Sequence, residues 1–243
     1  MSDRVRQVGT LSAVSVFLRP ERPSRDRRLS RARIVARAVE VLDAEGGRGL
    51  SMRRVAADLG VTAGSLYWYV ATKDELIELA HDAVLGEVLA EVRTGGTRGG
   101  WRAEVAGLAR ANRAMLLRHP WVPAGLADLP ALGPNALALS EAGLAALARA
   151  GFTGPDGDAA LAAVNDQVVG SVVAETAWRA SLRHAGDADE RDVGEHVRRV
   201  AREHPHLAAR AEAPGPVDVD AECERRFAFA LDCLLDGLAA RRA

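Results

Sequence analysis

The sequence predicts an all-α protein, and three observations lead to this class. Alanine, leucine, arginine and glutamate dominate the 243 residues, and all four favour helices, whereas β-branched and aromatic runs are scarce. Apolar residues recur every three or four positions, and no segment has the strict alternation that is typical of strands. Serine or threonine precedes several of these segments, and glycine or proline follows them, as expected at the ends of helices.

Caps and breaks divide the chain into successive helices. Ser30, Ser51 and Thr62 are the expected N-caps of the first three helices. The expected helices cover about residues 30–44, 51–59, 62–70, 73–92, 101–118, 135–150, 158–184 and 218–240, with a further one near 190–203. The expected organisation is a flexible basic arm over 1–29, a three-helix domain over 30–73, a connecting helix over 74–94, and a larger helical domain over 95–243.

The charge of the chain is unevenly distributed. Residues 1–73 carry 14 Arg and Lys against 7 Asp and Glu, a net charge of +7, while residues 74–243 carry 18 against 26, a net charge of −8. A basic front joined to an acidic body indicates that the N-terminal part meets a polyanion. A solvated basic tail is the alternative that charge alone leaves open.

Residues 51–70 have the pattern of a helix-turn-helix, in which two short helices are joined by the turn LGV. The second helix of such a unit enters the major groove with its N-terminal end toward the bases. In its sequence VTAGSLYWYV, helical spacing places Ala63, Leu66 and Val70 on the face that packs on the domain. The remaining positions surround this face and include three consecutive aromatic residues, of the ten in the whole chain. The only lysine, Lys73, begins the next helix, where an ammonium group suits a phosphate.

The run SMRRVAADLGVTAGSLYWYVATKDEL resembles the N-terminal DNA-binding domain of the TetR family of bacterial transcription regulators. The specific match covers about residues 30–90, and the rest is similar in helical layout and in its closing helix. The resemblance implies that Arg53 reads a base and that Trp68 grips the DNA backbone, although Trp68 could also be half-buried. Arg54 is expected to be a solvated charge. The full set of implied DNA contacts is Ser51, Met52, Arg53, Ala63, Gly64, Ser65, Tyr67, Trp68, Tyr69 and Lys73.

The resemblance also implies a homodimer that reads a near-palindromic operator. Its expected interface is a four-helix bundle formed by residues 158–184 and 218–240 of each copy, with an ordinary intrachain core as the alternative. Other helices of the larger domain would enclose a small-molecule effector. The expected effector contacts are Leu89, Leu108, Asn112, Leu116, His119, Trp121, Leu139, Asn165, Gln167 and Trp178. For His119 a helix C-cap is the simpler alternative.

Several classes of protein are disfavoured. The chain contains no GxSxG, P-loop or HExxH motif and no paired cysteine–histidine set, so we expect no enzyme. We expect no cofactor and no metal, because the histidines and asparagine with which tetracycline-binding members of the family hold the drug and magnesium do not recur. No apolar stretch is long enough to span a membrane, and we expect a cytoplasmic location. The acidic body argues against a non-specific architectural DNA protein. The leading interpretation is a repressor that a small-molecule inducer releases from its operator, with an activator as the alternative.

Overall fold

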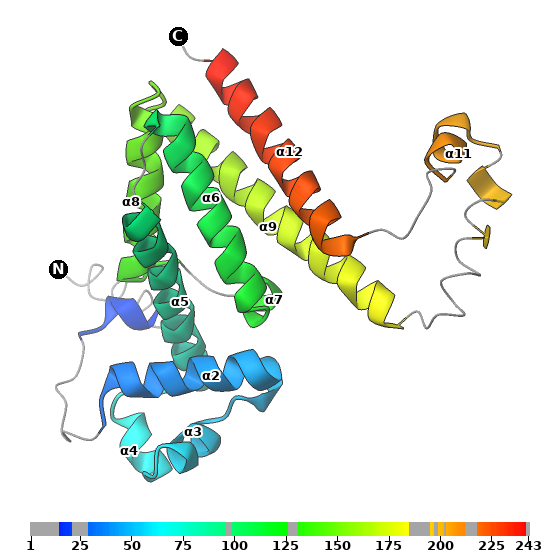
Figure 1. The fold of residues 1–243 in the computed structure, drawn as a ribbon. Coiled ribbons are helices and arrows are strands. Elements are labelled where there is room, and N and C mark those ends of the chain that lie inside the picture. Colours follow the sequence, from blue (N-terminus) through cyan, green and yellow to red (C-terminus); the bar gives the residue numbers. More distant parts are fainter. Residues whose placement is uncertain are drawn as a thin grey trace, which may run out of the picture.

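Helices make up both halves of the chain in a computed structural model (Figure 1). The model describes residues 15–20, 29–95, 99–125, 131–184, 195–196, 199–201, 203–211 and 218–241. The elements are η1 (Val16–Leu18), α2 (Arg31–Gly49), α3 (Met52–Asp58), α4 (Ala63–Tyr67), α5 (Lys73–Gly95), α6 (Gly100–Arg118), α7 (Trp121–Gly125), α8 (Pro134–Ala148), α9 (Gly154–His184), α11 (Pro205–Ala211) and α12 (Val219–Ala240). No described helix is long and apolar enough to cross a membrane. Every helix or strand element that the model describes is a helix, so the all-α prediction is confirmed.

Helices α2, α3 and α4 form the small unit at the bottom of Figure 1. The three predicted N-caps are present, because the hydroxyl oxygens of Ser30, Ser51 and Thr62 accept hydrogen bonds from backbone N–H groups three residues further on, at 3.2–3.3 Å. Gly60 makes the turn between α3 and α4 with a φ of +69°, a left-handed conformation that glycine adopts without strain. The fully buried Leu66 joins α4 to the shared core.

Helix α5 connects this unit to the larger helical body, and it packs against α2, α6 and α8. Its buried Asp82 accepts hydrogen bonds from the backbone N–H groups of Asn135 and Ala136, both at 3.0 Å. A carboxylate at this position stabilises the exposed N–H groups at the start of α8. Any side chain at Gly133 would overlap with Asp82, so this close approach requires glycine.

Helices α9 and α12 run beside each other along one side of the body, and α6 and α8, to their left in Figure 1, pack against α9. The apolar faces of these helices meet in the core through fully or nearly fully buried residues such as Val172, Phe227, Leu231 and Leu235. The opposite faces of α9 and α12 stay exposed and include Val173 and Phe229.

The structure corrects two expectations about the elements and agrees with a third. Part of the expected flexible arm, residues 15–20, is packed on α5, where Glu78 accepts hydrogen bonds from the Ser15 hydroxyl and from the Val16 N–H. This contact buries Val16 to 3% exposure. Gly46 has a non-helical backbone conformation, so the first helix is interrupted at the glycine cluster as expected, and the remaining residues of α2, to Gly49, follow this kink. Helix α11 was not predicted, and the helix expected near 190–203 falls partly outside the described residues.

Candidate DNA-reading surface and effector domain

Two adjacent arginines on α3 have different surroundings. Arg54 is paired with Glu45 at 3.0 Å and with Asp58 at 3.1 Å, so the solvated charge that we expected is an intramolecular ion pair. Hydrogen bonding from Arg37, with help from Arg54, holds the pKa of Asp58 below its usual range. Arg53 is exposed and has no hydrogen-bond or ion-pair partner within the described ranges, so its guanidinium is available for DNA.

The aromatic residues of the LYWYV run divide between the surface and the core. Tyr67 is 49% exposed, and its neighbour Leu66 is completely buried. Trp68 and Tyr69 are half-buried, and Tyr69 packs against the core. The burial of Trp68 therefore agrees with the alternative that this residue is half-buried. Tyr67 is the most exposed of the three aromatic residues.

Some of the other expected DNA contacts also have structural roles. Met52 is only 6% exposed and lies in the core, so its burial argues against the expected DNA contact. Ala63 is half-buried against the same core. The Ser51 hydroxyl caps α3, the Ser65 hydroxyl lies 3.0 Å from that of Thr62, and Lys73 Nζ donates to the Gly47 carbonyl at 2.6 Å. Gly64 is exposed at the start of α4.

The expected effector contacts fall into two groups. In one group, Asn112 Nδ2 donates to Asn165 Oδ1 at 3.2 Å, which joins α6 to α9. Trp178 belongs to α9 and is covered by the Arg226 guanidinium, 4.7 Å from its ring centre. Gln167 is half-buried on α9. The apolar members of this group are buried or half-buried along α5, α6 and α8, and they are Leu89, Leu108, Leu116 and Leu139.

The second group, His119 and Trp121, lies at the boundary between the body and the DNA-binding unit. His119 Nδ1 and Trp121 Nε1 each lie 2.7 Å from the same oxygen of Asp43 on α2. His119 is also the C-cap of α6, as the simpler expectation had it. Because both side chains turn toward α2, they are poor candidates for effector contacts.

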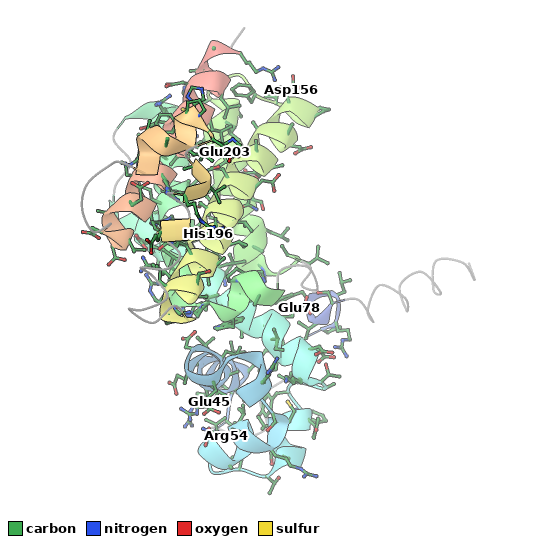
Figure 2. All side chains as sticks on the ribbon, turned by 90° about the vertical axis from the view of Figure 1, so that its right-hand side faces the viewer. Glu45, Arg54, Glu78, Asp156, His196 and Glu203 are labelled. Carbon is green, nitrogen blue, oxygen red and sulfur yellow. The ribbon has the colours of Figure 1, made fainter. Side chains whose placement is uncertain are left out.

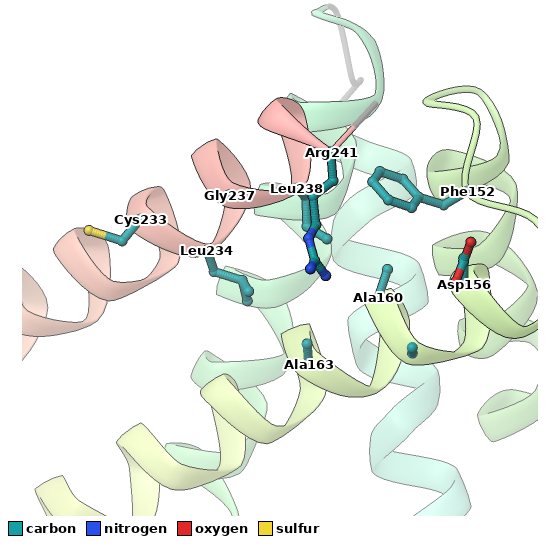
Figure 3. Close-up of a pocket in the computed structure, with 10 residues that line it drawn as sticks. Phe152, Asp156, Ala160, Ala163, Cys233, Leu234, Gly237, Leu238 and Arg241 are labelled. Carbon is teal, nitrogen blue, oxygen red and sulfur yellow. The ribbon is translucent and has the colours of Figure 1, made fainter. Parts of the chain in front are cut away.

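A hollow of about 600 Å³ lies between the start of α9 and the end of α12 (Figure 3). Small residues line much of it, including Ala160 and Gly237, while Asp156 and Arg241 place opposite charges on its wall. None of the ten expected effector contacts lines this hollow. Cys233, at its edge, is on the exposed side of α12, so the hollow belongs to the outer face of the two helices.

The sequence analysis missed a buried charged cluster that joins α6, α9 and α12. Arg113 donates to Glu175 at 2.6 Å and to Glu224 at 2.9 Å, and it lies over the Phe227 ring at 4.8 Å. Glu175, itself 5% exposed, also accepts from Arg179 at 2.8 Å. These partners lie 62 and 111 residues apart from Arg113, so no local spacing signals them.

Comparison with known proteins identifies the chain. Residues 34–80 match the model for bacterial regulatory proteins of the tetR family, and residues 96–242 match the tetracyclin repressor-like C-terminal domain. The chain belongs to the TetR family. TetR proteins are transcription regulators rather than enzymes, and the helix-turn-helix and helical C-terminal domain of this one follow the family pattern. Among the described residues, no group of three or more His, Cys, Asp or Glu is arranged to hold a metal.

Relatives from several bacteria support this assignment. An HTH-type transcriptional regulator of Saccharopolyspora erythraea is 45% identical over 203 residues, covering 83% of each chain. The HTH-type transcriptional repressor DrrR1 of Streptomyces coeruleorubidus is 35% identical over 89% of this TetR chain and 80% of its own. Among solved structures, Streptomyces coelicolor ActR in complex with actinorhodin is 26% identical, with a TM-score of 0.71 over 90% of this chain and 99% of its own. BioQ with its double-stranded DNA operator is 27% identical, with a TM-score of 0.55 over 88% and 99%.

Proposed function

We propose that this TetR protein is a repressor that binds a palindromic operator as a homodimer and is released by a small-molecule effector. The observation that carries the proposal is the free Arg53 beside the exposed Tyr67 on a helix-turn-helix. Arginine pairs with the O6 and N7 atoms of guanine in the major groove, and tyrosine can reach phosphates or base edges. DrrR1 is a repressor and BioQ binds an operator, which supports the same role here.

The outer face of α9 and α12 supports a homodimer. Phe229 is 67% exposed and Val173 is 50% exposed, and large apolar residues exposed together are typical of an interaction surface. Gly170 and Gly237 lie in these helices with nothing within 4 Å of the position of a Cβ atom. Glycine weakens a helix by about 1 kcal/mol relative to alanine. Close approach of the helices of a second copy would explain why glycine occupies these two positions. The partner would also cover the hollow beside Gly237.

The effector site that we propose lies among α5, α6, α8 and α9, around Asn112 and Asn165. Asn112 is half-buried on α6 and Asn165 is exposed on α9, and amide side chains beside apolar residues can orient a ligand. ActR, which shares the fold, binds actinorhodin, although the effector of this chain needs its own identification. Effector binding would shift α5, which joins the two units, and change the separation of the recognition helices. No metal or cofactor takes part in this proposal.

The experiment begins with a duplex selected by the protein from a random-sequence library. Footprinting should give one short palindromic site, and a continuous footprint would instead indicate non-specific binding. Gel shifts with Arg53→Ala should show affinity reduced about ten- to a hundredfold, because a bidentate arginine–guanine contact is lost. Arg54→Ala is the matched comparison: it removes the same charge from α3, but Arg54 is held by Glu45 and Asp58, so a smaller loss of affinity is expected. Equal loss in both variants would contradict the assigned reading surface.

A further inference from the structure

One carboxylate oxygen on helix α2 of the DNA-binding unit accepts two hydrogen bonds from the body. Asp43 Oδ1 lies 2.7 Å from His119 Nδ1 and 2.7 Å from Trp121 Nε1. Both donors are well buried, with 3% of the His119 side chain and 8% of Trp121 exposed, and the two rings meet edge to face. Hydrogen bonds to a charged acceptor in such surroundings are stronger than neutral ones. This contact therefore fixes the end of α6 and the start of α7 against α2.

The same imidazole also faces the connecting helix. His119 Nε2 lies 3.3 Å from Glu87 Oε2 on α5, and Arg118 donates to that oxygen at 2.5 Å. The imidazolium form can donate to Asp43 and Glu87 together, whereas a neutral ring donates to one of them. One ring therefore sets the end of α6 relative to both α2 and α5.

Two residues that follow Asp43 on α2 contact elements next to the DNA-binding surface. Glu45 accepts from Arg54 on α3 at 3.0 Å, and Figure 2 labels both residues within the DNA-binding unit. The Gly47 carbonyl accepts from Lys73, the first residue of α5, at 2.6 Å. Three residues within one five-residue stretch of α2 thus contact the body, the first helix of the helix-turn-helix and the start of the connecting helix. A displacement of Asp43 would be transmitted to both α3 and α5.

We propose that Asp43 is the positioning residue through which the body and the DNA-binding unit sense each other. The proposal rests on the proposed function. It adds a second path of coupling between the effector domain and the DNA-binding unit, which runs from α6 and α7 directly to α2 and acts together with the movement of α5. The two donors converge on one oxygen, so a shift at the end of α6 changes both hydrogen bonds together. Coupling of this kind is reciprocal: DNA bound at α3 and α4 must affect the end of α6 as much as the body affects DNA binding.

Reciprocity allows a test in which the effector need not be known. Hydrogen exchange is measured for the full chain with and without the duplex that the wild-type protein selects. In the wild type, DNA should slow exchange over residues 115–125 by about tenfold, the factor expected when one hydrogen bond to a charged group is held more firmly. Asp43→Ala and Trp121→Phe should lose this remote protection, and Trp121→Phe keeps an apolar ring in the core. Asp43→Asn, which keeps an acceptor oxygen, should restore most of it.

Arg118→Gln is the matched control. Arg118 lies next to His119 and contacts Glu87, but it does not touch Asp43, so its variant should keep the wild-type protection. Unchanged protection in Trp121→Phe and Asp43→Ala, or no protection in the wild type, would overturn the proposal while leaving operator binding intact. Failure to select any duplex would instead contradict the proposed function. Equal loss of protection in Arg118→Gln would also overturn the proposed role of Asp43, because a general loosening of α6 would then explain the effect.

Discussion

The DNA-binding unit and the helical body use polar side chains in different ways. In the unit, hydroxyl groups cap the helices on which they lie, at a separation of three residues, as Ser51 and Thr62 do. In the body, charged groups join helices that are distant in sequence, as Arg113 does with Glu175 and Glu224. Ion pairs between α2 and α3 also occur in the unit, as between Arg54 and Glu45, but the buried charged cluster that joins three helices lies in the body. The two regions should therefore respond differently to substitution.

The sharpest test within the unit compares Leu66 with Tyr67. Leu66→Ala removes a completely buried side chain and should lower the free energy of unfolding by about 2–5 kcal/mol, measured by chemical denaturation. Tyr67→Ala should change it by less than about 0.5 kcal/mol while weakening binding of the selected duplex. If Tyr67→Ala unfolded the protein as readily, the division of this helix into a core face and a DNA face would be wrong.

In the body, the largest effect is expected at Arg113. Arg113→Met leaves the buried Glu175 with Arg179 alone and should lower the free energy of unfolding by about 3 kcal/mol. Arg225→Met is the control, because Arg225 is exposed and pairs with Glu222 on its own helix, so the change should be small. Urea denaturation of both variants measures the two changes in the free energy of unfolding. Equal changes would contradict the larger contribution that we assign to the long-range pair of Arg113.

Phe229 tests whether the outer face of the body is an interface. Phe229→Ser should raise the dimer dissociation constant at least tenfold, since burying one phenylalanine contributes about 1.5–3 kcal/mol. Sedimentation at several concentrations gives this constant, and helix content by circular dichroism should not change. A dimer of unaltered strength would exclude Phe229 from the interface, and a wild-type monomer would contradict the proposed homodimer.

The smallest expected effect is a pH dependence from the buried His81 on α5. Burial lowers the pKa of His81, and the nearby Asp82 offsets this only in part. Below about pH 6.5 the unfolded chain therefore binds a proton that the folded chain does not, and the free energy of unfolding falls as the pH is lowered. His81→Leu should flatten this decline between pH 7 and 5, whereas His206→Leu, at an exposed position, should leave it unchanged. A steeper decline in His81→Leu would reverse the sign that we assign.

The difference between the regions also explains what could be predicted from the sequence. Caps, glycine turns and apolar spacing act over a few residues, so the helices and the helix-turn-helix could be located, and Arg53 and Tyr67 could be singled out. The burial of Met52 was not foreseen, because a family position does not reveal which way a side chain turns in this core. Asp43 and Glu78 could not be found at all, since their partners lie more than 60 residues away. For the same reason the effector contacts stay a prediction.

The single lysine has a practical consequence for labelling. Reagents that acylate amines find one side-chain target per chain, Lys73, besides the amino group at the N-terminus. Its Nζ atom donates to the Gly47 carbonyl, and Lys73 begins α5, the element that follows the helix with Tyr67. A fluorophore attached there would sit beside the candidate reading helix, and the rate at which it attaches would measure how much of that surface is covered. The chain thus carries its own site-selective handle, with no engineered cysteine needed.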